Sequence, residues 1–218
     1  MQFDCERARQ HMVDGQLKTN GIVDEAIVDA FLTVPREEFV PRSLTEAACR
    51  DEDLSLPDGG FLMEPLALAR LVDGARVRSS DVVLVLGCCT GYTSAIMSRM
   101  ASSVIALVTA KDLEAVRGRF DDQEIANAVA VETADLSSGA ASDGPYDVII
   151  IPGAVEHVPE VLLDQLSSKG RLVTIRRSGR LSHAICIRKV AGQLHEDILA
   201  DCWAPMLEGF AKKPEFTF

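Results

Sequence analysis

The sequence predicts a single α/β domain built on a doubly wound, mostly parallel β-sheet with an N-terminal helical extension. After residue 80, short apolar runs that read as buried strands alternate with helical patterns. Aromatic residues make up only 5% of the chain, with Trp203 the one tryptophan, so the core must consist mostly of smaller aliphatic side chains. The length of 218 residues fits one large domain better than two small ones.

The first 80 residues read as helices joined by turns. Asp24 is placed to cap a helix over Glu25–Thr33, because an aspartate accepts hydrogen bonds from the first free amides of a helix, and Pro35 ends that helix. The polar stretch Asp51–Gly60 contains one proline and two glycines and is expected to be a loop. Two further helices are predicted over Asp4–Leu17 and Glu64–Asp73.

The remaining elements follow the alternation of a doubly wound sheet. Val82–Leu86 (VVLVL) is a short apolar run that stops at Gly87, which is typical of a buried parallel strand. The other expected strands are Val104–Val108, Val129–Glu132, Tyr146–Ile151, Leu172–Ile175 and Ala184–Arg188. The expected helices are Tyr92–Met100, Lys111–Phe120 and Pro159–Leu166, with a hairpin around residues 178–180. We therefore divide the single domain into a helical region (1–80), a Rossmann-like core (81–190) and a C-terminal tail (191–218).

Charge and cysteine usage restrict the class of protein. The net charge of −11 disfavours binding to nucleic acid, which needs clustered lysine and arginine, and favours a soluble surface. The six cysteines form no CxxC pair and the four histidines are scattered, so no metal site is predicted. The N-terminus has no signal-peptide pattern, and no apolar run is long enough for a membrane span. These features predict a cytoplasmic protein with reduced thiols.

The turn after the first predicted strand is the first candidate binding element. Residues 87–91 (GCCTG) join the strand to the next helix, and glycine lets a ligand approach the backbone closely. Ligands of such sheets bind outside the carboxyl ends of the strands, where this turn lies. A purely structural turn would have a similar sequence, so the turn alone leaves both interpretations open.

Two longer segments resemble conserved blocks of protein-L-isoaspartate O-methyltransferases. They are residues 12–41, which include VPREEFVP, and residues 145–173, which include YDVIIIPGAVEHVPEVLLDQL. The resemblance covers the chain from about residue 10 to about residue 190. It implies the class I S-adenosylmethionine methyltransferase fold and a substrate protein that carries an isoaspartyl residue, whose free carboxylate attacks the methyl group of the cofactor.

The resemblance also assigns candidate residues to this sequence. In the family's cofactor turn it retains Gly87, Thr90, Gly91 and Tyr92, and Asp135 matches the acid that faces the adenine amino group. The alternative for Asp135 is a cap or turn acid. The family's substrate loop matches residues 57–65 (PDGGFLMEP), of which Pro65 is retained.

Four departures from the family pattern fall around this one predicted site. The family has an acidic residue two positions before the first glycine of the turn, and this chain has Val85 there. The middle glycine of the family is replaced by Cys89, whose side chain would intrude on the ligand and would strain the backbone if φ were positive. The family has an acidic residue at the end of the second strand, and this chain has Val108 there. Asp112 lies four residues further on, at the start of the next helix, and is not expected to replace the missing acid. In the substrate loop the histidine, serine and glutamine of the family become Asp58, Met63 and Glu64, and the acids among them would repel a carboxylate.

The clustering of the departures suggests a scaffold that is kept while its chemistry is weakened. The sequence therefore predicts a methyltransferase-like protein with impaired or lost catalysis that binds a protein partner as an accessory subunit of a larger assembly. The first alternative is an active S-adenosylmethionine-dependent protein-L-isoaspartate O-methyltransferase with an unusual pocket. The second is the same fold with a different ligand.

Overall fold

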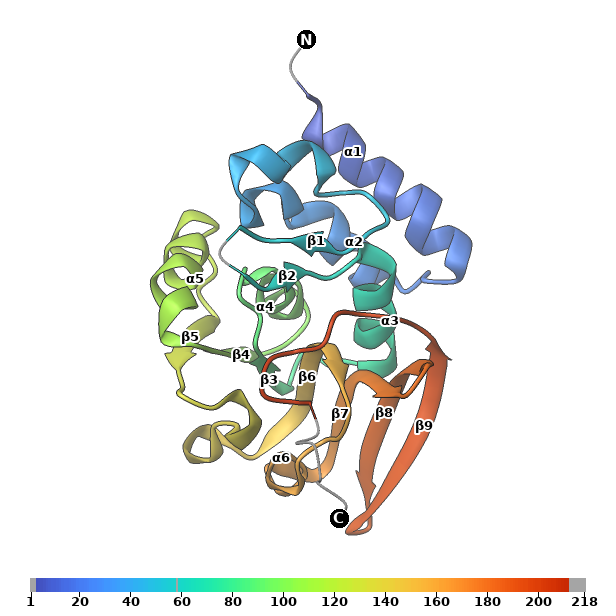
Figure 1. The fold of residues 1–218 in the computed structure, drawn as a ribbon, viewed down its shortest axis with the longest axis vertical. Helices are drawn as coiled ribbons and strands as arrows, with labels where there is room; N and C mark the ends of the chain where they lie inside the picture. Colours follow the sequence, from blue (N-terminus) through green and yellow to red (C-terminus); the bar gives the residue numbers. More distant parts are fainter. Residues whose placement is uncertain (1–2, 58, 212–218) are drawn as a thin grey trace, which may run out of the picture.

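The computed structural model describes residues 3–57 and 59–211, which form a seven-stranded sheet with helices on both faces and a small two-stranded sheet beside it (Figure 1). The helices are α1 (Cys5–Met12), α2 (Glu25–Thr33), α3 (Pro65–Ala75), α4 (Tyr92–Ser98), α5 (Ala110–Asp122) and α6 (Glu160–Asp164). The small sheet pairs β1 (Leu54–Ser55) with β2 (Phe61–Leu62). The strands of the main sheet are β3 (Val82–Leu86), β4 (Ser103–Val108), β5 (Ala128–Glu132), β6 (Tyr146–Val155), β7 (Leu166–Ser178), β8 (Leu181–Val190) and β9 (Gln193–Asp201).

The main sheet has the strand order β5-β4-β3-β6-β7-β8-β9. The first five strands in this order are parallel, whereas β8 and β9 are antiparallel additions at one edge. The chain reverses its direction across the sheet between β3 and β6, as a doubly wound fold requires. The predicted fold class is confirmed. The topological switch point lies between the carboxyl ends of β3 and β6, and the carboxyl end of β4 lies on the other side of β3.

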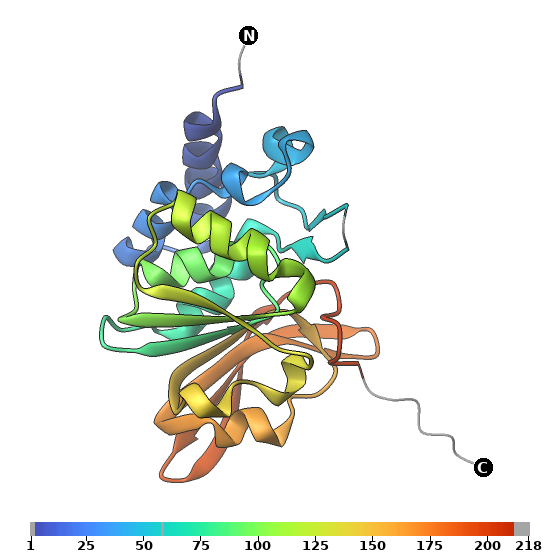
Figure 2. The same ribbon diagram turned by 90° about the vertical axis from the view of Figure 1, so that its left-hand side faces the viewer.

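Alternate side chains of the central strands enter two different layers. Val83 and Val85 pack with the N-terminal helices α1–α4, and residues of β4 on the same face pack against α5. Leu84 and Leu86 point the other way and pack with α6 and the C-terminal segment. Figure 2 shows the two helical layers on either side of the sheet. Because both faces are covered, the strands are nearly continuous apolar runs.

Several predicted elements have the expected bounds. The helix Glu25–Thr33 begins where Asp24 accepts hydrogen bonds from the amides of Ala26 and Ile27. The strand Val82–Leu86 is β3, and the predicted hairpin joins β7 to β8 with Ser178 opposite Leu181. The described residues of the predicted loop, 51–57, 59 and 60, are mostly irregular, apart from the short strand β1.

Other elements differ from the prediction. The α-helical part of the first helix stops at Met12 and continues as a π-helical stretch over Val13–Leu17. The helix predicted over residues 159–166 is short, because Leu166 already pairs with Tyr146 as the start of β7. The sheet also extends beyond residue 190, where we placed the end of the core, since β9 pairs with β8 along its whole length.

The structure also bears on membrane, metal and disulfide sites. Within residues 3–57 and 59–211, no helix is both long and apolar enough to cross a membrane. The same residues contain no group of three or more histidine, cysteine or acidic side chains that could hold a metal ion. All six cysteines are free thiols.

Candidate functional site

The glycine-containing turn predicted as a binding element follows β3 directly. Gly87 and Gly91 have φ angles of 72° and 81°, in the left-handed region that favours glycine. A Cβ atom on Gly91 would also lie 3.2 Å from the ring of Phe120 in α5. Thr90 accepts a hydrogen bond from the amide of Tyr92 and so supports the start of α4. The turn therefore needs glycine at its first and last positions.

Cys89, at the middle position of the turn, does not have a positive φ, so the backbone strain anticipated there is absent. Its sulfur atom lies 3.5 Å from the carbonyl oxygen of Phe61 and so contacts β2 at the end of the β1–β2 loop. Burial raises the pKa of the Cys89 thiol to about 11, so the group is neutral at physiological pH. The side chain narrows the space between the turn and the loop without distorting either.

Two adjoining cavities open at the carboxyl ends of β3 and β4. One has a volume of about 240 Å³ and is lined by Gly87, Cys89 and residues of the β1–β2 loop. The other, of about 610 Å³, is lined by residues 132–136 after β5. The two share the residues Thr109, Lys111, Leu136 and Glu208. We refer to them together as the cleft.

The end of β4 presents a carboxylate to the cleft, although not from the predicted position. Val108 is fully buried and packs against α5, so its side chain does not enter the cleft. The hydroxyl of Thr109 donates a hydrogen bond of 2.9 Å to the carboxylate of Asp112, and both residues line the smaller cavity. The first turn of α5 thus returns Asp112 towards the strand end, which the distance along the sequence did not indicate.

Asp135 lies at the far end of the cleft and acts there as a turn acid. Its carboxylate accepts hydrogen bonds from the amide and hydroxyl of Ser137 and from the hydroxyl of Ser138. The hydrogen bonds from these serines lower the pKa of Asp135, so it is a carboxylate at neutral pH. Since it also lines the larger cavity, the same group is available to a ligand there.

The loop matched to the family's substrate segment faces the cleft through residues that the sequence did not single out. Ser55, Gly60 and Phe61 line the smaller cavity, whereas the predicted residues Met63, Glu64 and Pro65 do not line either part of the cleft. Met63 is 2% exposed and belongs to the hydrophobic core. Pro65 is the first residue of α3 and is also buried. Asp58 lies outside the described residues.

The segment Met63–Pro65 is instead anchored to the protein core by Arg36. The buried guanidinium of Arg36 donates hydrogen bonds to the carbonyl oxygens of Ala48 and Met63, and it lies 4.8 Å from the ring centre of Tyr92. Tyr92, predicted as a site residue, is therefore a core residue whose ring supports Arg36. The motif VPREEF positions the loop and does not take part in the cleft surface.

Glu64 carries its charge at an energetic cost. Burial is the main cause that raises its pKa, and the neighbouring carboxylates of Asp53 and Asp51 add to the effect. A raised carboxyl pKa in the folded protein means that stability is greatest at low pH and falls as the pH rises through that pKa. We expect Glu64→Gln to raise the melting temperature by roughly 1–4 °C at pH 7 and to have little effect near pH 4.

Thermal unfolding followed by circular dichroism at both pH values measures this difference. The control is the substitution Glu46→Gln, which removes one charge from an exposed position. A melting temperature that rises equally at both pH values would show that the charge of Glu64 is not the cause.

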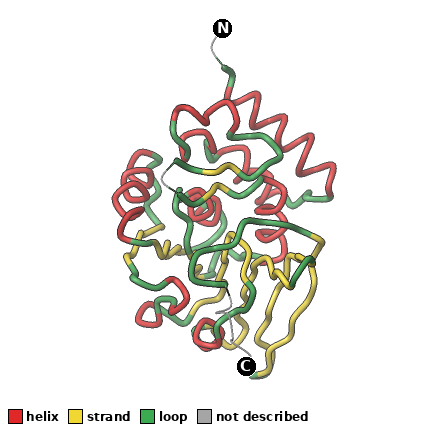
Figure 3. The backbone as a smooth tube through the Cα atoms, in the orientation of Figure 1, coloured by secondary structure: helices red, strands yellow, loops and turns green. Residues whose placement is uncertain are grey.

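The C-terminal segment after β9 runs back towards β3 and β6 (Figures 1 and 3) and supplies part of the cleft lining. Ala154 donates a hydrogen bond to the carbonyl of Pro205 and accepts one from the amide of Leu207, so this segment lies along the end of β6. A Cβ atom on Gly87 would lie only 2.9 Å from the side chain of Leu207. Residues 205–208 line the smaller cavity, although no sequence pattern predicted that this part of the chain contributes to a site.

Comparison with known proteins identifies the family. The model of the protein-L-isoaspartate(D-aspartate) O-methyltransferase family matches residues 7–203. A protein-L-isoaspartate O-methyltransferase of Koribacter versatilis is 36% identical, with 92% of this chain and 89% of the relative covered. A relative of the same name from Methanoculleus marisnigri is 30% identical, with 98% and 97% covered.

Solved structures agree with this assignment. One solved structure, of a protein-L-isoaspartate O-methyltransferase, has a TM-score of 0.80 at 25% identity. The match covers 93% of this chain and 67% of the chain in that structure. A Plasmodium falciparum structure, solved in complex with S-adenosyl-L-homocysteine, has a TM-score of 0.76 at 20% identity. The match covers 95% of this chain and 100% of the Plasmodium chain and supports the fold alone. The chain belongs to the protein-L-isoaspartate(D-aspartate) O-methyltransferase family.

Proposed function

We propose that this chain transfers a methyl group from S-adenosylmethionine to the free carboxylate of isoaspartyl residues in damaged proteins. The observation that carries the proposal is the cleft at the carboxyl ends of β3 and β4, which combines a glycine turn with carboxylates at two places. Family membership supports the same reaction. The proposal replaces loss of catalysis as the preferred interpretation, because the departures from the family pattern leave the cleft open.

The residues of the cleft fit an adenosine-bearing cofactor. Asp112 and Thr109 offer oxygen acceptors for ribose hydroxyls at the end of β4, in place of the missing carboxylate at Val108. Leu136 supplies an apolar surface between the two cavities, and Asp135 offers an acceptor to the adenine amino group. Bound there, the cofactor would supply an electrophilic methyl group.

The chemistry asks little of the protein beyond binding and orientation. The isoaspartyl carboxylate is ionised at neutral pH and is itself the nucleophile. Its oxygen forms a bond to the methyl carbon while the bond from that carbon to sulfur breaks, which releases S-adenosylhomocysteine and leaves a neutral methyl ester. No proton moves, so no general base is needed. Phe61 and Leu207 both lie close to Gly153 and line the smaller cavity, where they form an apolar wall.

Lys111 is the side chain best placed to attract the substrate carboxylate. It lines both parts of the cleft and a third cavity of about 420 Å³ between α5 and the β1–β2 loop, where Arg119 is a second cation. Its ammonium nitrogen lies 3.9 Å from the position of a Cβ atom on Gly59. On a chain of net charge −11, this cationic wall offsets the repulsion that an anionic substrate meets elsewhere.

The substitution Lys111→Met is expected to raise KM for an isoaspartyl peptide about tenfold and to change kcat little, because one charge-assisted contact in binding is lost. Initial rates at saturating cofactor measure both constants. The control is Lys18→Met, which removes a lysine that pairs with Asp14 on the exposed surface of the N-terminal region. An unchanged KM in the Lys111 variant would place the substrate carboxylate elsewhere.

A second candidate function is protein binding without catalysis, as an accessory subunit. Cys89 and Val108 favour it, since the first narrows the space beside the turn and the second offers no carboxylate at the end of β4. Calorimetric titration of the whole chain with S-adenosylhomocysteine separates the two candidates. Micromolar binding together with methylation of an isoaspartyl peptide supports the enzyme. Absence of binding at millimolar concentration rejects the enzyme, and affinity purification from native cells then tests the accessory role.

A further inference from the structure

A separate cavity of about 740 Å³ lies at the amino ends of the parallel strands, at the opposite end of the sheet from the cleft. It is bounded by residues 20–22, the second half of α3, the loop from Arg76 to Arg78, the start of β7 and the edge strands β8 and β9. None of its lining residues also lines the cleft. We refer to it as the basic cavity.

The basic cavity concentrates positive charge on an acidic protein. It is lined by six of the 22 lysine and arginine residues in the chain and by two acids. The six are Arg70, Arg76, Arg78, Lys169, Arg171 and Arg188, and the two acids are Asp73 and Asp197. The difference of six and two gives the lining a formal charge of +4, whereas the whole chain has −11. Such a local reversal of sign attracts anions and disfavours cations.

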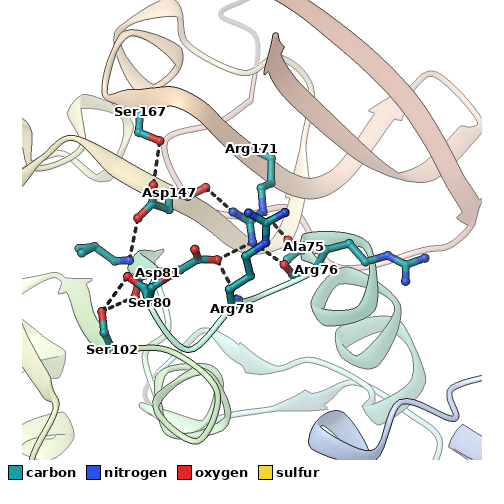
Figure 4. A network of polar contacts seen from close by, with 10 residues as sticks. Ala75, Arg76, Arg78, Ser80, Asp81, Ser102, Asp147, Ser167 and Arg171 are labelled. Atoms are coloured by element: carbon teal, nitrogen blue, oxygen red, sulfur yellow. Dashed lines mark hydrogen bonds and ion pairs between the residues drawn. The ribbon is translucent and has the colours of Figure 1, made fainter.

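Arg171 holds the loop that carries Arg76 and Arg78 (Figure 4). The guanidinium of Arg171 donates hydrogen bonds to the carbonyl oxygens of Ala75, Arg76 and Asp147 and pairs with Asp81 at 2.6 Å. The carboxylate of Asp81 also accepts a hydrogen bond from the amide of Arg78. The backbone of the loop is thereby held, so the side chains of Arg76 and Arg78 start from fixed positions.

The loop also contains a conformation that side chains rarely adopt. Arg76 has φ 48° and ψ 50° at the end of α3, a left-handed position that helices usually fill with glycine. An arginine there costs free energy that glycine would avoid, and such outliers gather where a side chain has a function. This observation is independent of the charge of the cavity.

The charges of the basic cavity are only partly neutralised. Arg188 pairs with Asp197, and Arg171 pairs with Asp81. Across the part of the chain that the structure describes, no ion pair involves Arg76, Arg78 or Lys169. These three side chains can therefore serve a ligand. Guanidinium groups bind phosphate oxygens in pairs, which makes a cluster of arginines suited to several phosphates close together.

We infer that the basic cavity binds the phosphate groups of a small polyanion, through Arg76, Arg78 and Lys169. Its volume accommodates a chain of phosphates, and Ile198 offers an apolar wall beside the cations. The two sources of this chemistry are an inorganic polyphosphate and a nucleoside triphosphate. The inference does not depend on methyl transfer, because the basic cavity and the cleft share no residues.

Calorimetric titration of the whole chain with inorganic tripolyphosphate at low ionic strength tests the inference. We expect micromolar binding that weakens at least tenfold in the double variant Arg76→Gln/Arg78→Gln and that falls as salt is added. The matched control, Arg99→Gln/Arg117→Gln, removes the same charge from exposed ion pairs elsewhere and should change binding less than twofold. Circular dichroism of both double variants verifies that the fold is kept.

Further ligands identify the source and exclude simple attraction of charge. Adenosine triphosphate, added with S-adenosylhomocysteine at saturating concentration to occupy the cleft, binds more tightly than tripolyphosphate if a nucleotide is the ligand. It binds equally if the phosphates alone are recognised. The inference is overturned if tripolyphosphate does not bind at millimolar concentration, if the control loses as much affinity as the double variant, or if hexaglutamate binds as tightly as tripolyphosphate.

Discussion

Replacing Arg171 with methionine is expected to lower the free energy of unfolding by about 3–5 kcal/mol. The side chains of Arg171 and Asp81 are only 11% and 7% exposed, so the substitution leaves a buried carboxylate without its counter-charge. It also removes the donor for the carbonyls of Ala75, Arg76 and Asp147. Because the contacts of Arg171 with Ala75, Arg76 and Asp81 join residues 90 to 96 positions apart in the chain, their loss acts on the folded state as a whole.

Urea unfolding followed by fluorescence of Trp203 and by circular dichroism measures the change in stability. The matched control is Arg188→Met, which breaks an ion pair with Asp197 that is largely exposed and should cost less than about 1 kcal/mol. Addition of Asp81→Asn to the Arg171 variant should restore part of the lost stability, since no buried charge then remains. A loss below about 1 kcal/mol in the Arg171 variant would contradict the expected role of the ion pair.

The substitution Arg36→Met is expected to cost about 2–4 kcal/mol, because it leaves two buried carbonyl oxygens without donors. Arg36 is fully buried, and burial is the main cause that lowers the pKa of its guanidinium. One of its acceptors is the carbonyl of Met63, next to the loop that faces the cleft. We therefore also expect kcat/KM for an isoaspartyl peptide to fall more than the loss of folded protein explains.

Unfolding in urea measures the change in the free energy of unfolding. Initial rates well below the melting temperature measure kcat/KM. Arg42→Met, at an exposed position a few residues further along the chain, is the control and should change neither. Arg36→Lys keeps the charge but loses the forked geometry, so it should recover only part of the activity. Full activity in the folded Arg36→Met variant would show that the loop does not need this support.

The elements that were predicted correctly are those whose sequence signal is local. The helix α2 has its own cap in Asp24, and β3 is an uninterrupted apolar run that ends at a glycine. Strand β9 has no such signal, because it lies at the edge of the sheet and most of its side chains are exposed. The early start of β7 was also not predictable, since Leu166 pairs with Tyr146 ahead of an irregular polar stretch, and regular pairing with β6 resumes only at Arg171.

The candidate site divides in the same way. Gly87, Cys89 and Thr90 could be placed from the sequence, because one short turn fixes their positions. Ser55 and the residues 205–208 could not, since distant contacts alone bring them to the same cavity. Asp112 was not expected to replace the missing acid because it lies four positions after Val108, whereas the first turn of α5 brings its carboxylate back to the end of β4.

The C-terminal segment over Gly87 has a consequence for the order of events on the ribosome. The chain leaves the ribosome with its N-terminus first, and every other part of the cleft precedes Pro205 in the chain. A nascent chain can therefore form the glycine turn, the β1–β2 loop and β6 before Leu207 has left the exit tunnel. The cleft acquires its final wall only when translation has passed this residue, so a stalled chain that ends before it would expose an unfinished pocket.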